Sequence, residues 1–193
     1  FCVGVVERKN VIDGSAIAPD DVVIGLASSG LHSNGYSLAR KIVFDIAGLG
    51  VEQSVEELGE TVGQALLRPT RIYVHGVRQV LAHYRVKSVV HGIAHITGGG
   101  LLENLARIVP DGIELALRRG SWPIPPVFDW LQRLGEVEQA EMERVFNMGI
   151  GMVLIASPFY AESIRQQLHR AGIDNWVIGT ARPGPKGTVW HED

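Results

Sequence analysis

Three glycine-bearing segments carry the side chains best suited to bind a ligand. The first loop is residues 28–35 (SSGLHSNG), the second is residues 97–100 (TGGG) and the third is residues 147–151 (NMGIG). Each combines glycines with hydroxyl or amide groups beside an apolar segment, and glycine lets backbone N–H groups turn toward one point. The first two loops precede predicted helices, whose N-termini favour negative charge. The pattern predicts an anion site, with phosphate as the candidate ligand; the alternative is that the glycines serve only tight turns and packing.

None of the three loops matches a standard nucleotide-binding motif. Gly149-Ile-Gly151 lacks a third glycine and is followed by the strand-like run MVLIA, so it is not a dinucleotide fingerprint. No Lys-Ser or Lys-Thr pair follows the second loop, which excludes a Walker loop. Residue spacing alone therefore indicates a phosphate-binding domain without a recognisable nucleotide signature.

Two histidines and three glutamates raise other chemistries. His91 and His95 are four residues apart, but β-branched and small apolar neighbours favour a strand, and no Cys, Asp or Glu lies close in sequence to complete a metal site. A strand does not exclude a metal pair geometrically; we expect ordinary hydrogen-bonded histidines and no metal site in this chain. Glu138, Glu141 and Glu143 are expected on a solvated helix face and not as a catalytic carboxylate pair.

The elements that position these loops follow from hydrophobic periodicity. Residues 38–46 predict an amphipathic helix with Leu38, Ile42 and Ile46 on its inner face and Asn34 or Ser37 as its cap. The remaining predicted elements are strands over 1–7, 22–27, 88–96, 113–117, 152–156, 176–181 and 188–191, and helices over 61–67, 71–84, 101–109, 127–134, 138–145 and 158–171. This alternation predicts an α/β (α+β) fold, a layered domain with a mixed β-sheet flanked by helices.

Composition narrows the class of protein. The chain has 193 residues, of which 46% are hydrophobic and 20% charged, and a net charge of −3. Without a basic cluster, a dedicated nucleic-acid binder is not expected, and no apolar run approaches the roughly 20 residues of a membrane span. The single cysteine, Cys2, allows no internal disulfide and is expected to be buried. A cytoplasmic location is the resulting expectation.

Several long stretches resemble one enzyme family. They are SSGLHSNGYSLARKI, LLRPTRIYV, AHITGGGLLENLARIVPDG, PPVFDWLQ and FNMGIGMV, in this order. Together they resemble the C-terminal half of aminoimidazole ribonucleotide synthetases, also called phosphoribosylformylglycinamidine cyclo-ligases. The resemblance covers nearly the whole chain. It implies that residues 1–12 hold the last strand of an N-terminal ATP-binding and dimerisation domain, and that residues 13–193 form the C-terminal substrate-binding α/β domain.

The resemblance also implies an activity. Family members use ATP and Mg²⁺ to close the imidazole ring of formylglycinamidine ribonucleotide in purine synthesis, and they form homodimers through their N-terminal domains. The N-terminal half of the family has no counterpart in this sequence, so the Mg²⁺ ligands and much of the ATP site are expected there. The chain is therefore expected to need that half as a partner and to be inactive alone.

Site residues carried over from the resemblance lie in the three loops. His32 is implied in acid–base or phosphate-stabilising work, because an imidazole changes its charge near neutral pH. The second loop would supply N–H donors to phosphate oxygens, and Asn147 would orient the substrate amide. The full implied substrate- or phosphate-binding set is Ser29, Ser33, Asn34, Gly35, Thr97, Gly98, Gly99, Gly100, Asn147, Gly149 and Gly151.

Two alternatives remain open at this point. One is another ATP-dependent enzyme of the same superfamily, such as formylglycinamidine synthetase or a small-molecule kinase; the segment Trp122–Gln132 favours the cyclo-ligase instead. The other is a non-catalytic lobe that binds a phosphate or a partner and exposes an apolar surface where a further domain docks.

Overall fold

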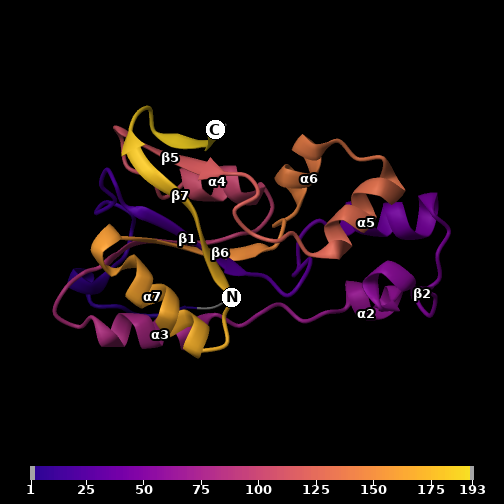
Figure 1. Cartoon of the computed structure of the whole chain (residues 1–193), viewed down its shortest axis with the longest axis horizontal. Coiled ribbons are helices and arrows are strands. Elements are labelled where there is room, and N and C mark those ends of the chain that lie inside the picture. Colours follow the sequence, from indigo (N-terminus) through magenta and orange to yellow (C-terminus); the bar gives the residue numbers. More distant parts are fainter. Residues whose placement is uncertain (1–2, 192–193) are drawn as a thin grey trace.

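A six-stranded mixed sheet forms the centre of the computed structural model, which describes residues 3–191 (Figure 1). Its order is β4–β6–β1–β7–β5–β8, and all neighbouring pairs are antiparallel except β5–β8, which is parallel. The predicted fold class is therefore confirmed. The strands are β1 (Val22–Ala27), β4 (Val90–His95), β5 (Ile113–Arg118), β6 (Ile150–Ala156), β7 (Asn175–Pro183) and β8 (Gly187–His191); β2 (Ser54–Val55) and β3 (Glu60–Thr61) form a separate small sheet.

Helices cover both faces of the large sheet and build a lobe beside it. They are α1 (Tyr36–Arg40), the π-helix η2 (Lys41–Ile46), α2 (Val62–Leu66), α3 (Val74–His83), α4 (Gly100–Ala106), α5 (Pro126–Gly135), α6 (Gln139–Val145) and α7 (Pro158–Arg170), with 3-10 turns η1 (Arg8–Asn10) and η3 (Glu56–Leu58). None of these helices, within residues 3–191, is long and apolar enough to span a bilayer.

The alternation of side chains along β1 explains why the large sheet has a hydrophobic core on each of its two faces. Val23 faces the core that contains Leu101 and Leu105 of α4, whereas Ile24 and Leu26 face the core that α3 and α7 share. Successive side chains of a strand point to opposite faces, so a continuous apolar run is buried on both sides. The run Val22–Ala27 is therefore the central strand that its composition predicts.

A third core lies outside the sheet, in the lobe built by α1, η2, α2, α5 and α6 (Figure 1). Phe128 and Phe146 meet at its centre with their ring centroids 5.9 Å apart. Ile42 and Val43 of the π-helix pack into the same core. The lobe continues directly from the first loop, so its packing fixes where that loop ends.

The helix observed in α1 and η2 differs in two ways from the helix that periodicity predicts over residues 38–46. Ile46 is 56% exposed instead of buried, because the wider π-helical turn rotates later residues away from the stripe that contains Ile42. Neither Asn34 nor Ser37 caps the helix: α1 follows Gly35, which has a left-handed φ of 72°, without a side-chain cap. Glycine is needed at position 35 because a Cβ there would collide with the ring of Phe146.

The predicted N-terminal strand is wrong over its described part. Val3–Glu7 have no regular structure, and the side chains of Val3 and Val5 are fully open to solvent. A strand needs a neighbour for its backbone hydrogen bonds, and no described strand of this chain pairs with these residues. Phe1 and Cys2 lie outside the described residues. The domain division at residue 12 stays a prediction.

Candidate functional site

Strand direction brings the three glycine-bearing loops to one edge of the sheet. β6 runs antiparallel to both β1 and β4, so these two strands end where β6 begins. Ala27 pairs with Ile150, and His95 pairs with Met152. The first and second loops leave this edge and the third loop enters it. Segments up to about 120 residues apart in the chain therefore meet in one place.

Asn147 holds the third loop to the first. Its side chain is fully buried, its Nδ2 donates to the carbonyl of Gly30 at 2.8 Å, and its Oδ1 accepts from the N–H of Gly149 at 2.8 Å. Both ends of the amide are committed inside the protein. Asn147 therefore ties the third loop to the first in this structure, and its predicted contact with a substrate amide stays a prediction.

His32 is buried at the centre of the first loop, with 3% of its surface exposed and a left-handed φ of 57°. Its Nε2 accepts hydrogen bonds from the backbone N–H groups of Ser29 (3.0 Å) and Arg71 (3.4 Å). Because Nε2 is an acceptor, the proton of the neutral ring lies on Nδ1. Nδ1 is buried and has no hydrogen-bond partner among the described residues.

The surroundings of His32 disfavour its charged form. Burial lowers its pKa to about 4, and electrostatic interactions with His95 and Arg71 add to the effect. The ring is therefore neutral at neutral pH in this structure, and its implied acid–base or phosphate-stabilising role stays a prediction. What the geometry leaves available is a neutral Nδ1–H donor.

The segment between α2 and α3 lies across the first loop; we call residues 69–73 the strap. Its side-chain contacts join Ser29 Oγ to Pro69 O (2.6 Å), Ser33 Oγ to Thr70 Oγ1 (3.3 Å) and Tyr73 Oη to Ala27 O (2.8 Å). The backbone N–H of Arg71 completes the series at His32. Burial raises the pKa of Tyr73 well above its ordinary value, so its hydroxyl stays a donor.

The strap corrects the predicted start of the helix at Arg71. α3 begins only at Val74, because the preceding residues bind the first loop instead of continuing the helix. Residue periodicity did not assign the strap any role in the site. Its signal in the sequence was the stretch LLRPTRIYV, where Pro69 interrupts the helical pattern.

The second loop uses much of its hydrogen-bonding capacity internally. The N–H of Gly99 donates to Arg144 O (2.9 Å) and the N–H of Gly100 to Thr97 O (3.1 Å). Asn104 Nδ2 donates to the carbonyls of Thr97, Gly98 and Gly100. The N–H groups of Gly99 and Gly100 are thus not free for phosphate oxygens, and the packing alternative explains these two glycines.

His91 has a hydrogen-bond partner that sequence proximity did not indicate. Its Nδ1 lies 2.6 Å from Oδ2 of the buried Asp21, 70 residues away in the chain, as the predicted hydrogen-bonded histidine requires. His95 is exposed on the same strand. Over residues 3–191, no group of three His, Cys, Asp or Glu side chains is placed to hold a metal ion.

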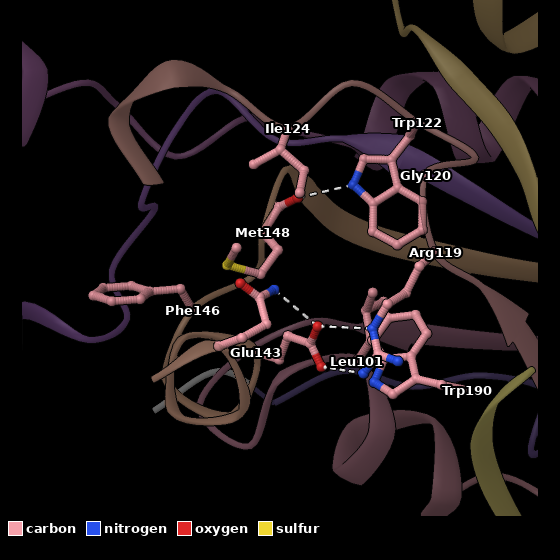
Figure 2. Close-up of a pocket in the computed structure, with 10 residues that line it drawn as sticks. Leu101, Arg119, Gly120, Trp122, Ile124, Glu143, Phe146, Met148 and Trp190 are labelled. Carbon is pink, nitrogen blue, oxygen red and sulfur yellow. Dashed lines mark hydrogen bonds and ion pairs between the residues drawn. The ribbon is translucent and has the colours of Figure 1, made fainter. Parts of the chain in front are cut away.

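An aromatic pocket borders the second and third loops (Figure 2). Trp122 and Trp190 stack with centroids 6.3 Å apart, and Trp122 Nε1 donates to the carbonyl of Met148 at 2.8 Å. Arg119 binds both carboxylate oxygens of Glu143, at 3.1 and 3.0 Å. The pocket thus braces the third loop through Met148 and contains a neutralised ion pair.

Glu143 is not on the predicted solvated face, since its side chain is only 12% exposed. Burial alone would raise its pKa, but hydrogen bonds from Arg119 and Gln139 outweigh burial and lower it. The carboxylate is therefore held ionised against Arg119. Glu141, by contrast, lies at the surface and pairs with Arg144 on its own helix.

The fold and the converging loops place the chain in a defined class of domain. The sequence profile of the family described as AIR synthase related protein, C-terminal domain, matches residues 18–192, and the chain belongs to this family.

Curated relatives carry a more specific name. A phosphoribosylformylglycinamidine cyclo-ligase of Pseudothermotoga lettingae is 48% identical over 189 residues, covering 98% of this chain and 54% of the relative. One of Desulfitobacterium hafniense is 52% identical over 190 residues, with the same coverage. The chain spans about half the length of the curated relatives it matches.

Solved structures support the fold at low sequence identity. A thiamine-monophosphate kinase from Stenotrophomonas maltophilia superposes with a TM-score of 0.63 at 16% identity, covering 96% of this chain and 54% of that one. The PurLQS structure from Thermotoga maritima gives a TM-score of 0.53 at 14% identity, covering 97% and 26%. These similarities concern the fold alone.

Proposed function

We propose that this chain is the substrate-binding part of an ATP-dependent phosphoribosylformylglycinamidine cyclo-ligase that acts in purine synthesis in the cytoplasm. The observation that carries the proposal is a sequence identity of 48% and 52% to two cyclo-ligases, each over 98% of this chain. The convergence of the three loops at one sheet edge supports it, because a small substrate needs groups from several elements in one place.

The first loop is the part of the chain that we assign to the ribonucleotide. Ser33 is exposed, and Asn34 and Gly35 are half-buried, so all three can reach a ligand at the sheet edge. We assign His32 to the same site as a neutral ring whose Nδ1–H has no hydrogen-bond partner among the described residues. Bound ATP supplies the phosphoryl group that turns the formyl oxygen of the substrate into a leaving group.

We propose that the N-terminal half of the cyclo-ligase, which has no counterpart in this chain, completes the enzyme. We propose that Mg²⁺ and most of the ATP site belong to that half, as the family resemblance implies. That half, as part of a homodimer, is also the proposed neighbour of the exposed residues Val3, Val5 and Val6. This chain alone is then expected to show no ring closure.

A chimera tests the proposal. This chain replaces the matching region of the Desulfitobacterium hafniense relative, and formation of aminoimidazole ribonucleotide is measured from formylglycinamidine ribonucleotide and ATP. We expect ring closure by the chimera and reduced turnover by the same chimera carrying His32→Asn. A folded chimera that phosphorylates a small molecule or performs glutamine-dependent amidation instead would refute the cyclo-ligase assignment. Unchanged turnover of the folded variant would remove His32 from the mechanism.

The internal bonding of the second loop favours one competing function, a lobe that binds a ligand without catalysis. Calorimetric titration of the chain does not separate the two functions, but a turnover assay of the chimera does. The lobe alone should bind the ribonucleotide weakly and ATP poorly in either case. Only the cyclo-ligase assignment predicts that the chimera turns the bound ribonucleotide over.

A further inference from the structure

We propose that Ser33, Thr70 and Arg71 form a subsite for a phosphate monoester, the ribose phosphate of the ribonucleotide. The proposal rests on the proposed function and adds the strap to the residues that bind substrate. It assigns to Thr70 and Arg71 a contact that neither residue spacing nor the family resemblance attached to them.

Two hydroxyls meet where the strap crosses the first loop. Ser33 Oγ and Thr70 Oγ1 lie 3.3 Å apart, and both residues are exposed. Each hydroxyl has one donor hydrogen and two acceptor lone pairs, and their mutual contact uses only one of the two hydrogens. At least one donor therefore remains for a phosphate oxygen, which accepts hydrogen bonds.

One positively charged residue, Arg71, directly follows Thr70 in the strap. Arg71 is half-buried, and its charge is close enough to His32 to disfavour a second positive charge there. Arg71 Nη1 donates to Gly172 O at 3.1 Å, which anchors the guanidinium while most of its five N–H donors stay available. The strap therefore supplies one cation, Arg71, in addition to the two hydroxyls, for a phosphate dianion to bind.

The subsite is assembled before a ligand arrives. Ser29 Oγ binds the carbonyl of Pro69, and the Arg71 N–H binds His32, so hydrogen bonds on either side of Thr70 fix the strap to the first loop. Groups that are already held in place lose little conformational entropy on binding. The same contacts join the phosphate subsite to the His32 ring, so binding at Thr70 is transmitted to the loop.

NMR titration of the chain with inorganic phosphate and with ribose 5-phosphate tests the subsite. We expect backbone amide shifts confined to the first loop and the strap. Thr70→Val should weaken ribose 5-phosphate binding about tenfold, since it removes one hydrogen bond to a charged group, whereas Thr70→Ser should retain binding. Thr180→Val, at an exposed threonine of β7, is the matched control and should bind like the wild type. Shifts elsewhere, or equal binding by Thr70→Val, would overturn the proposal.

A further titration with formylglycinamidine ribonucleotide separates this proposal from the cyclo-ligase assignment. If ribose 5-phosphate binds at the strap but the ribonucleotide binds no more tightly, the subsite stands and the assigned substrate is wrong. If the ribonucleotide binds tightly and Thr70→Val leaves its affinity unchanged, the assigned substrate stands and the subsite is refuted.

Discussion

Replacing His32 with asparagine should remove a specific acid sensitivity from the folded chain. His32 has a pKa of about 4 in the folded state against an ordinary value of 6.5, because the ring is buried near positive charge. Between these values the unfolded chain binds the proton and the folded chain does not, so the folded state loses stability as the pH falls from 6.5 to 4. The difference of about 2.5 in pKa corresponds to about 3 kcal/mol, of which roughly 2 kcal/mol is lost by pH 5.

Urea denaturation at pH 7 and pH 5, followed by tryptophan fluorescence, measures this effect. Trp122 and Trp130 are buried and report unfolding. Asparagine suits the site because it tolerates the φ of 57° and has no group that titrates between pH 5 and pH 7. Wild type should therefore lose about 2 kcal/mol more than His32→Asn between the two pH values.

The comparison uses the difference between two proteins, so that other titrating groups cancel. His83→Asn, at an exposed histidine of α3, controls for the removal of an imidazole from the chain. If wild type and His32→Asn lose the same stability from pH 7 to pH 5, His32 is not held as a buried neutral ring, and the reasoning fails.

Two further substitutions test the packing of the loops, both by urea denaturation at pH 7. Gly100→Ala should destabilise the chain by at least about 2 kcal/mol, because its Cβ would lie 1.8 Å from Glu143 O at a left-handed φ of 62°. Gly98→Ala is its matched control: the added methyl group meets no described atom within 4 Å, and equal losses would contradict the packing argument. Asn147→Ala should lower the free energy of unfolding by about 3 kcal/mol, since Gly30 O and the N–H of Gly149 lose their partner. A loss under 1 kcal/mol would refute the bracing role of Asn147.

Regular elements were the most predictable part of the fold. The apolar run Val22–Ala27 is β1, with the predicted bounds. Pro158 and Gly172 mark the beginning and end of α7, and Gly172 has the left-handed φ of 75° that such a terminus requires. These signals are local, since backbone geometry and burial of one face decide them within a few residues.

Elements whose form depends on distant packing were predicted less well. The π-helical turn rotates Ile46 out of the stripe, and nothing in the spacing of four residues announces it. The helix α3 begins at Val74 and not at Arg71; in the strap before it, the N–H of Arg71 donates to His32, 39 residues earlier. A hydrogen bond between such distant residues leaves no periodic trace in the sequence.

The sequence by itself determined which segments become strands and helices, and it placed glycines, hydroxyls and His32 in three loops. Only the tertiary structure decided which of their polar groups face a ligand and which face one another. Asn147 and the second loop turned inward, while Ser33 and Thr70 stayed exposed. The reason is that a polar group must find a partner once it is buried, and three-dimensional packing, not chain order, supplies that partner.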